Sequence, residues 1–349
     1  MITTVVWLIA GLLMTQLLLL IWMMIRKKRE LVLQERVKNL DEKLTKEFRA
    51  FIDGEVIHHP RFPDEQKLKI ELMESILERS LEGADTLEKK DRIRQLAEAS
   101  LGDIYRNRLH YAGWSNRINA LYFIEDFRMY SLDDEVYTNT DRRKQKKDEE
   151  FRQGLRTMAA LQDRRVFLLL EEDLDLPFPL LKEVFQRLDQ ASIAYWFSRY
   201  ETTADIPEPL LCAFISHCGD VKSEDDQEIV ELALNDSRAE VRIKALKALS
   251  SYQAVREPAR LLLFFQSEQW EERLMVAKLA GHAGLKQYRT QLMKLMEDRE
   301  WWVRFAAANA IRMLPDGEAH LREIASTHKD PYARDMADRT LTTKWGMTS

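Results

Sequence analysis

The sequence predicts an all-α protein, and three observations lead to that fold class. The 349 residues include 11 glycines and 9 prolines, whereas average usage of roughly 7% and 5% would give about 24 and about 17. Apolar residues recur every three or four positions over most of the chain, as in helices with one buried face. A segment near the C-terminus repeats at intervals of 31, 31 and 30 residues. These features argue against sandwiches and barrels and predict an α-solenoid, which is a stack of helical pairs.

The first predicted element is a single N-terminal transmembrane helix. Residues 5–25 (VVWLIAGLLMTQLLLLIWMMI) carry no charge, and as a helix they would span roughly 31 Å, about the thickness of the hydrocarbon layer. Trp7 and Trp22 lie near its two ends, where interfacial tryptophans are common. A cleaved signal peptide is the alternative, but it would need a basic start and a shorter apolar run. Residues 1–4 contain no basic side chain, so the sequence favours an uncleaved anchor that contacts the lipid bilayer.

The charges beside this segment predict its orientation. Residues 26–29 (RKKR) follow it directly, and no charged side chain precedes it. The positive-inside rule therefore predicts a single-pass protein of the cell membrane, with its N-terminus outside and the bulk of the chain cytoplasmic. Without these four positive charges the net charge falls from −5 to −9, which is unfavourable for binding nucleic acid. The basic residues could also contact anionic lipid, although a role in topology is a sufficient explanation.

Gln16 lies near the middle of the apolar segment, where an amide is costly. It could hydrogen-bond a neighbouring membrane helix, at about 0.6 kcal/mol per bond. No G-x-x-x-G motif accompanies it. Helix association through Gln16 is therefore one hypothesis, and simple tolerance of one polar residue is the other.

Residues 26–52 are predicted to continue as an amphipathic helix, most of it within a stalk at residues 30–59. Two interpretations of its apolar stripe remain open. A parallel coiled coil would give a homo-oligomer through the stalk or the span, whereas packing in cis would hold the stalk on its own domain. Fewer than three heptads favour packing in cis. The stripe comprises Leu33, Val37, Leu40, Leu44, Phe48 and Phe51.

Residues 60–222 are predicted to form a further α-helical domain, with degenerate repeats as one option. Helical period is clear over residues 64–82 and 87–110. The segment 132–150 is polar and highly charged, and we interpret it as a long connection between helical groups.

The repeated segment at residues 223–342 is centred on an arginine. Three and seven residues after each arginine are apolar residues at helical spacing, and each segment follows another short apolar stretch. Each repeat is thus predicted to be a pair of antiparallel helices that buries its apolar faces only by stacking. The four arginines are Arg242, Arg273, Arg304 and Arg334.

Two repeats show the pattern best, Asp236…Val241-Arg242…Ala245…Leu249 and Asp298…Val303-Arg304…Ala307…Ile311. In this pattern the sequence resembles the HEAT-repeat family in its short bacterial form, over about a third of the chain. The second repeat departs from it at Ser267 and Glu272, and the fourth at Thr340; a weaker copy surrounds Arg117. The resemblance implies a protein-binding scaffold without catalytic residues of its own.

Two sets of residues in the array are candidates for a role. The four arginines are predicted to form a structural ladder that bridges acids such as Asp236 and Asp298, with a ligand-binding arginine row as the alternative. A basic stripe on the second helices could bind an acidic segment of a protein partner, or be only a solvated face. The stripe comprises Lys244, Lys247, Lys278, Asn309 and Arg312.

The sequence predicts no catalytic, cofactor-binding or metal site. It contains no H-E-x-x-H, P-loop, G-x-G-x-x-G or G-x-S-x-G motif. Cys212, His217 and Cys218 lie close together, but a second pair of ligands for tetrahedral zinc is absent. Buried thiols are the preferred interpretation, and the protein is not expected to be an enzyme.

The predicted organisation gives a function hypothesis and an alternative. An anchor with its basic flank (1–29), the stalk (30–59), the helical domain (60–222), the array (223–342) and a tail (343–349) suggest a membrane-anchored cytoplasmic adaptor. A non-catalytic subunit of an envelope or secretion assembly is one setting for it. The alternative is a regulatory module that transmits partner or ligand binding through the stalk and the membrane helix.

Overall fold

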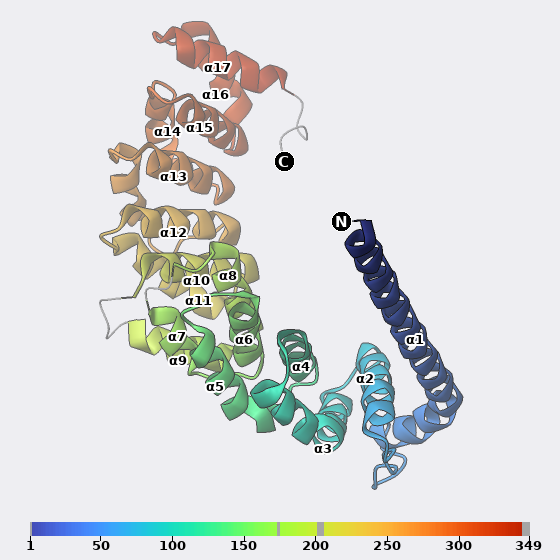
Figure 1. The fold of residues 1–349 in the computed structure, drawn as a ribbon. Helices are drawn as coiled ribbons and strands as arrows, with labels where there is room; N and C mark the ends of the chain where they lie inside the picture. The colour runs from blue at the N-terminus through green and yellow to red at the C-terminus, as the bar shows by residue number, and fades with distance from the viewer. Residues whose placement is uncertain (1, 173–174, 201–205, 344–349) are drawn as a thin grey trace. The chain divides into compact units, whose positions relative to one another are not determined.

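The computed structural model describes residues 2–172, 175–200 and 206–343, without the side chains of residues 2–6, 8–10, 42, 199 and 200. The described residues form helices and turns with no strand, which confirms the all-α prediction. The chain divides into two compact units, Met1–Arg165 and Val166–Ser349 (Figure 1). The finer predicted boundaries at residues 29, 59 and 222 stay predictions, and residues 344–349 of the predicted tail lie outside the described residues.

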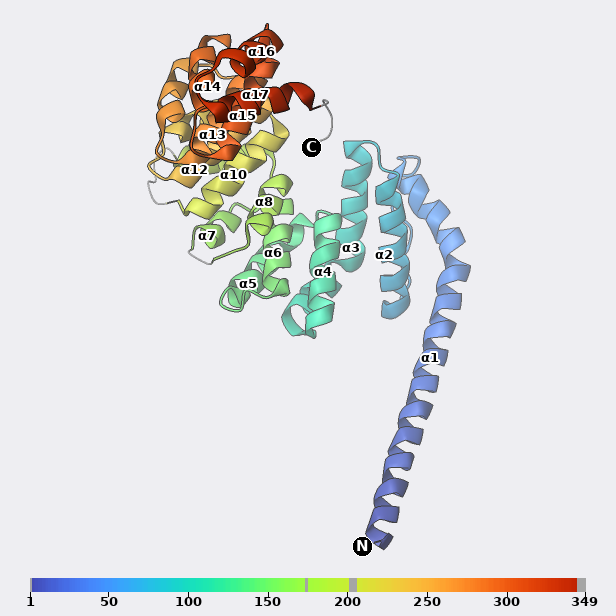
Figure 2. The same ribbon diagram turned by 90° about the horizontal axis from the view of Figure 1, so that it is seen from above.

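Unit 1 begins with one long helix, α1, whose C-terminal part lies beside α2 (Figure 2). The last turn of α1 is buried in the unit, since Phe48, Phe51 and Ile52 are at most 7% exposed. The turn after it folds back, because the Phe62 ring stacks on Phe48 with centroids 5.8 Å apart. The elements of unit 1 are α1 (Ile2–Ile52), α2 (Gln66–Glu82), α3 (Leu87–Tyr111), α4 (Trp114–Asp126), η1 (Tyr130–Leu132), α5 (Asp133–Arg143) and α6 (Glu149–Ala160).

The side chains described in the N-terminal half of α1 are mostly apolar and exposed. Within the described part of the chain, no helix combines the length and the hydropathy needed to cross a membrane. The predicted transmembrane segment includes residues 5, 6 and 8–10, whose side chains lie outside the description. From Leu12 to Ile25 the large apolar side chains are 40–65% exposed, so they do not belong to the core of unit 1.

The interpretation of residues 132–150 as a long connection was wrong, because α5 occupies much of that segment. Its buried side includes Val136, Asn139 and Thr140. Acidic residues fill its first turn and Arg142 and Arg143 its last, which complements the helix dipole. A helix that buries one strongly apolar residue has too weak an apolar period to be recognised from the sequence.

Unit 2 contains the arginine-centred repeats. The segments around the four arginines are α12, α13, α15 and α17, which we call the second helices, and each packs on the next. The short helix before each of them is α11, η3, α14 and α16 respectively. The elements of unit 2 are α7 (Val166–Glu171), α8 (Phe178–Arg187), α9 (Gln190–Tyr200), α10 (Glu208–Val221), α11 (Glu224–Leu232), η2 (Ala233–Asn235), α12 (Ala239–Tyr252), η3 (Pro258–Gln266), α13 (Trp270–His282), η4 (Lys286–Tyr288), α14 (Arg289–Leu295), α15 (Trp301–Met313), α16 (Gly317–Thr327) and α17 (Pro331–Thr342).

Two glycines allow neighbouring helices of this stack to approach closely. A Cβ atom on Gly281 of α13 would lie 2.7 Å from the Cα atom of Ala310 on α15, and one on Gly219 of α10 would lie 2.9 Å from that of Ala248 on α12. Helix α10 therefore meets α12 as α13 meets α15. Leu211 of α10 lies 31 residues before Arg242. The repeat period therefore continues into α10, but a leucine occupies the position of the arginine.

Candidate functional site

Each second helix begins after a turn closed by a side chain six residues before its arginine. This side chain accepts a hydrogen bond from the backbone N–H two residues later, at 2.8–3.2 Å. An N–H group at the start of a helix has no partner within the helix, so the contact supplies one. The four side chains are Asp236, Ser267, Asp298 and His328. Three different chemical groups thus perform the same local task.

The four ladder arginines form hydrogen bonds within the same turns. In each, Nη1 donates to the carbonyl oxygen six residues earlier at 2.6–2.9 Å. It also donates to the carbonyl five residues earlier at 2.8–3.2 Å. Both carbonyls belong to the turn in front of the arginine's own helix. This half of the contact is therefore complete within one repeat.

The other side of the guanidinium reaches the following repeat. Arg242 donates from Nε to Glu272 at 2.7 Å, and Arg273 donates from Nε and Nη2 to the two oxygens of Asp298 at 2.6 and 3.0 Å. Burial opposes ionisation of Asp298, but the hydrogen bonds from Arg273 and the Glu300 N–H hold its pKa below the ordinary value. Asp236, the other acid expected in the ladder, pairs instead with Arg238 at 2.8 Å.

The two departures of the second repeat prove to be one compensated change. Ser267 replaces the turn acid, and Glu272 replaces the motif valine. The Ser267 hydroxyl donates to Glu272, whose residue is 2% exposed and which accepts the Arg242 guanidinium. The carboxylate has therefore moved five positions along the chain and still serves the preceding arginine.

At the last junction of the array, Arg304 has no carboxylate partner among the described residues. Arg304 lies over the ring of Tyr332, with Cζ 5.3 Å from the ring centroid. Its Nε is buried and has no hydrogen-bond partner among the described residues. The turn residue here is His328, whose Nε2 lies 3.3 Å from Glu297. The guanidinium is consequently held more loosely here than at the two preceding junctions.

The weaker copy around Arg117 in unit 1 makes the same kind of contacts. Arg117 donates from Nη1 to the carbonyl of Ala112 at 2.6 Å and from Nε and Nη2 to Glu150 at 2.6 and 2.8 Å. Burial opposes ionisation of Glu150, yet hydrogen bonds from Arg117 and Asn139 keep its pKa below the ordinary value. The arginine contact is therefore not confined to unit 2.

The residues of the predicted basic stripe have different surroundings. Lys247 and Lys278 are exposed and occupy the same position, five residues after the ladder arginine. Lys244 lies over the Phe178 ring at 5.0 Å. Asn309 accepts from Arg312 at 2.7 Å, and Arg312 donates to the carbonyl of Thr340 at 2.8 Å, near the end of α17. Two of the five side chains are thus free to face a partner, and Arg312 ties α15 to α17.

Exposed aromatic residues lie on the same face and were not among the predicted site residues. Trp302 and Tyr332, each two residues before a ladder arginine, are 57% and 65% exposed. Met313, nine residues after Arg304, is 38% exposed. Positions two before, five after and nine after the arginine share one side of a helix. We call this surface of the second helices the lysine–tryptophan face.

The two cysteines considered in the sequence analysis, Cys212 and Cys218, are buried. Burial raises the pKa of Cys212 to about 11 and also raises that of Cys218. Burial lowers the pKa of His217. Among the described residues no group of three His, Cys, Asp or Glu side chains could hold a metal ion. Gln16, the remaining predicted site residue, is exposed on α1.

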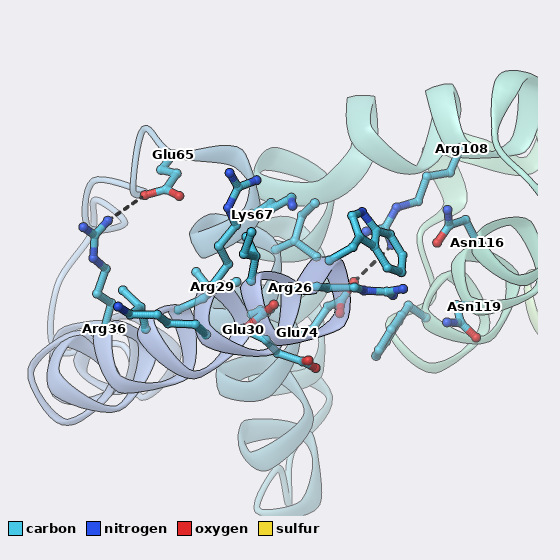
Figure 3. A pocket seen from close by; sticks show the side chains of 18 residues that line it. Arg26, Arg29, Glu30, Arg36, Glu65, Lys67, Glu74, Arg108, Asn116 and Asn119 are labelled. Atoms are coloured by element: carbon cyan, nitrogen blue, oxygen red, sulfur yellow. Dashed lines mark hydrogen bonds and ion pairs between the residues drawn. The ribbon is translucent and has the colours of Figure 1, made fainter. Parts of the chain in front are cut away.

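A pocket of about 1060 Å³ lies in unit 1 between α1 and the helices α2, α3 and α4 (Figure 3). Its charged lining includes two internal ion pairs, Arg36 with Glu65 at 3.5 Å and Arg108 with Glu74 at 3.3 Å. Burial raises the pKa of Glu74, although Tyr105 and Arg108 both donate to it. No feature of the sequence pointed to this pocket, because its walls come from segments far apart in the chain.

Comparison with known proteins agrees with the repeat geometry. Residues 257–342 match the family model for HEAT repeats. The match supports the HEAT-repeat assignment for this part of a helical repeat protein. No curated protein matches the chain.

Two solved structures are similar at low identity. An engineered protein of the Northeast Structural Genomics Consortium has 13% identity and a TM-score of 0.35, over 80% of each chain. The crystal structure of Kap121p bound to Nup53p has 12% identity and a TM-score of 0.39, over 88% of this chain. This chain spans 37% of the length of that second relative.

Proposed function

We propose that the protein is a non-catalytic adaptor that binds a protein partner on the lysine–tryptophan face of its array. The observation that carries the proposal is the combination of exposed Trp302 and Tyr332 with exposed Lys247 and Lys278 on one side of the second helices. Tryptophan and tyrosine are enriched among residues that dominate interface energies. The lysines favour a partner segment that carries acidic residues beside apolar ones.

The test of this proposal needs the partner and two matched pairs of variants. The partner is first identified by mild-detergent purification of the full chain and mass spectrometry. We expect the double variant K247E/K278E, and separately W302A, to weaken its binding at least tenfold. The controls are K286E/K294E, which reverses two exposed lysines before and within α14, and W114A, which removes a tryptophan that is 53% exposed in unit 1. Equal affinity for all variants would exclude this face as the docking surface.

We further propose that residues 5–25 anchor the adaptor in the cell membrane, with the N-terminus outside and the units in the cytoplasm. The absence of charge in this segment, the exposed apolar side chains of α1 and the basic residues 26–29 support the proposal. Apolar side chains on every side of a helix are stable only when lipid or protein surrounds them. An envelope or secretion assembly is a setting in which such an adaptor would operate.

Membrane anchoring is tested by fractionation and protease access. The full chain should stay in the membrane pellet after alkaline carbonate extraction, and a chain lacking residues 1–25 should not. Protease added outside intact cells should remove a tag at the N-terminus and spare one at the C-terminus. Release of the full chain by carbonate would reject the anchor and leave the docking proposal untouched.

A regulatory module is the second candidate function, and the continuity of α1 favours it. One helix runs from Ile2 to Ile52, and its last turn is buried in the core of unit 1. A displacement of the N-terminal half would therefore reach that core directly. Replacing residues 5–25 with an unrelated membrane helix distinguishes the two functions, since an adaptor would retain activity and a transmitter would lose it.

A further inference from the structure

The pocket in unit 1 combines unpaired cations with an apolar wall. Its lining includes Arg26, Lys28 and Arg29 of α1 and Lys67 of α2, and none of the four has an ion pair within the described part of the chain. The lining acids are fewer, and two of them, Glu65 and Glu74, are already paired with arginines. The pocket therefore offers an excess of positive charge to a ligand.

The apolar part of the lining begins in the proposed membrane segment. Trp22 and Ile25 are the pocket residues closest to the N-terminus, and both belong to the uncharged run of residues 5–25. The Arg26 guanidinium lies over the Trp22 ring at 5.4 Å. In Figure 3 the Arg26 side chain extends from α1 toward the side where Asn116 and Asn119 of α4 lie. An occupant would thus meet cations and amides beside the apolar side chains of Trp22 and Ile25.

The position of the pocket along α1 matches the level of lipid headgroups. The headgroup layer on each side of a bilayer is roughly 5–7 Å thick, and a helix rises about 1.5 Å per residue. If the hydrocarbon layer ends near Ile25, residues 26–29 lie within that layer. Arg26, Lys28 and Arg29 are then at the depth of the phosphate groups.

We propose that this pocket binds the headgroup of an anionic phospholipid, with the phosphate at Arg26, Arg29 and Lys67. The inference rests on the proposed membrane anchoring, because the anchor brings the pocket to the lipid. It goes further than attraction of a basic flank to a charged surface. A flank would need residues 26–29 alone, whereas the pocket also requires Lys67, which comes from a different helix.

Lys67 gives the sharpest test, and Lys90 gives its control. Lys67 lines the pocket, whereas Lys90 is an exposed lysine of α3 that does not. The full chain in non-ionic detergent is titrated with dihexanoyl phosphatidylglycerol, dihexanoyl phosphatidylcholine and inorganic phosphate. We expect phosphatidylglycerol to bind at least tenfold more tightly than the other two. K67E should weaken that binding at least tenfold, and K90E should change it less than twofold.

The possible outcomes distinguish failure of the lipid-binding proposal from failure of the membrane-anchoring proposal. Equal affinity of the wild type, K67E and K90E for phosphatidylglycerol would overturn the pocket, whatever the carbonate extraction shows. Inorganic phosphate binding as tightly as the lipid, with the same loss in K67E, would overturn the assignment to a lipid. Selective lipid binding that depends on Lys67 supports the pocket even if carbonate extraction rejects the anchor.

Discussion

The two junctions of α15 with its neighbours differ in how an arginine is held. Toward α13, Arg273 and Asp298 form a two-bonded ion pair whose side chains are 9% and 7% exposed. Gly281 also lets the helices approach closely there. Toward α17, Arg304 has the ring of Tyr332 in place of a carboxylate, and its Nε has no partner among the described residues. The same sequence motif therefore forms two kinds of junction. We call the one between α13 and α15, which has the ion pair, the locked junction, and the one between α15 and α17, which lacks it, the loose junction.

The largest expected effect comes from removing the carboxylate of the locked junction. Asp298→Ala leaves the Arg273 guanidinium buried without a counter-charge, which costs about 3–5 kcal/mol. The urea midpoint of unit 2 should fall accordingly. Asp335→Ala, which removes an exposed acid of α17, should change stability by less than about 0.5 kcal/mol. Similar midpoints for the two variants would show that the junction is not locked by this pair.

Filling the close approach at the same junction should have the next largest effect. Gly281→Ala gains about 1 kcal/mol of helix propensity but places a methyl group 2.7 Å from a backbone atom of Ala310. Overpacking of this kind costs about 1–3 kcal/mol, so we expect net destabilisation in thermal unfolding. Gly102→Ala in α3, where no atom lies within 4 Å of the new Cβ, should instead be neutral or stabilising.

The locked junction should also be sensitive to acid. The pKa of Asp298 is lowered from an ordinary value of 3.8 in the folded protein, so folding favours its ionised form. Its contribution is complete above about pH 4 and is lost as the pH falls through the lowered value. The difference in urea midpoint between the wild type and Asp298→Asn should therefore shrink below pH 4. A constant difference down to pH 2 would contradict this linkage.

The smallest effect is expected at the loose junction. Tyr332→Ala removes an exposed ring from the Arg304 guanidinium, and a cation–π contact of this kind is worth about 0.5–1 kcal/mol. Hydrogen exchange in α17 should rise slightly, with little change in α13. A loss of stability as large as that caused by Asp298→Ala would mean that the two junctions are equally stable.

The repeats of unit 2 could be predicted because each has an arginine in a fixed place. Sequence reasoning stopped at Arg242, since Leu211 occupies the corresponding position of α10 and only the 31-residue interval remains. Helix α5 was missed because it buries Asn139 and Thr140 beside Val136. A polar buried face has no apolar period to detect.

The site residues depended more on tertiary contacts than the fold did. Lys247 and Lys278 are as exposed as their spacing suggests. The hydrogen bond from Arg312 to the carbonyl of Thr340 joins residues 28 positions apart. No local sequence pattern predicts this contact. Trp302 is exposed, whereas its neighbour Trp301 stacks on Phe305 with ring centroids 5.1 Å apart, and no local pattern distinguishes the two.

The turn contacts bear on how such a protein can change its length during evolution. Each ladder arginine binds the carbonyls of its own turn, and each turn residue accepts a hydrogen bond from the backbone N–H two residues later in the same turn. At the first two junctions one carboxylate links a repeat to the arginine of the one before it, and Glu272 and Asp298 show that its place in the chain is not fixed. A repeat that carries such a carboxylate can consequently be duplicated without stranding a buried charge, since each copy supplies the acid for the arginine before it. Every added copy would extend the lysine–tryptophan face by one helix, so partner size and array length can change together.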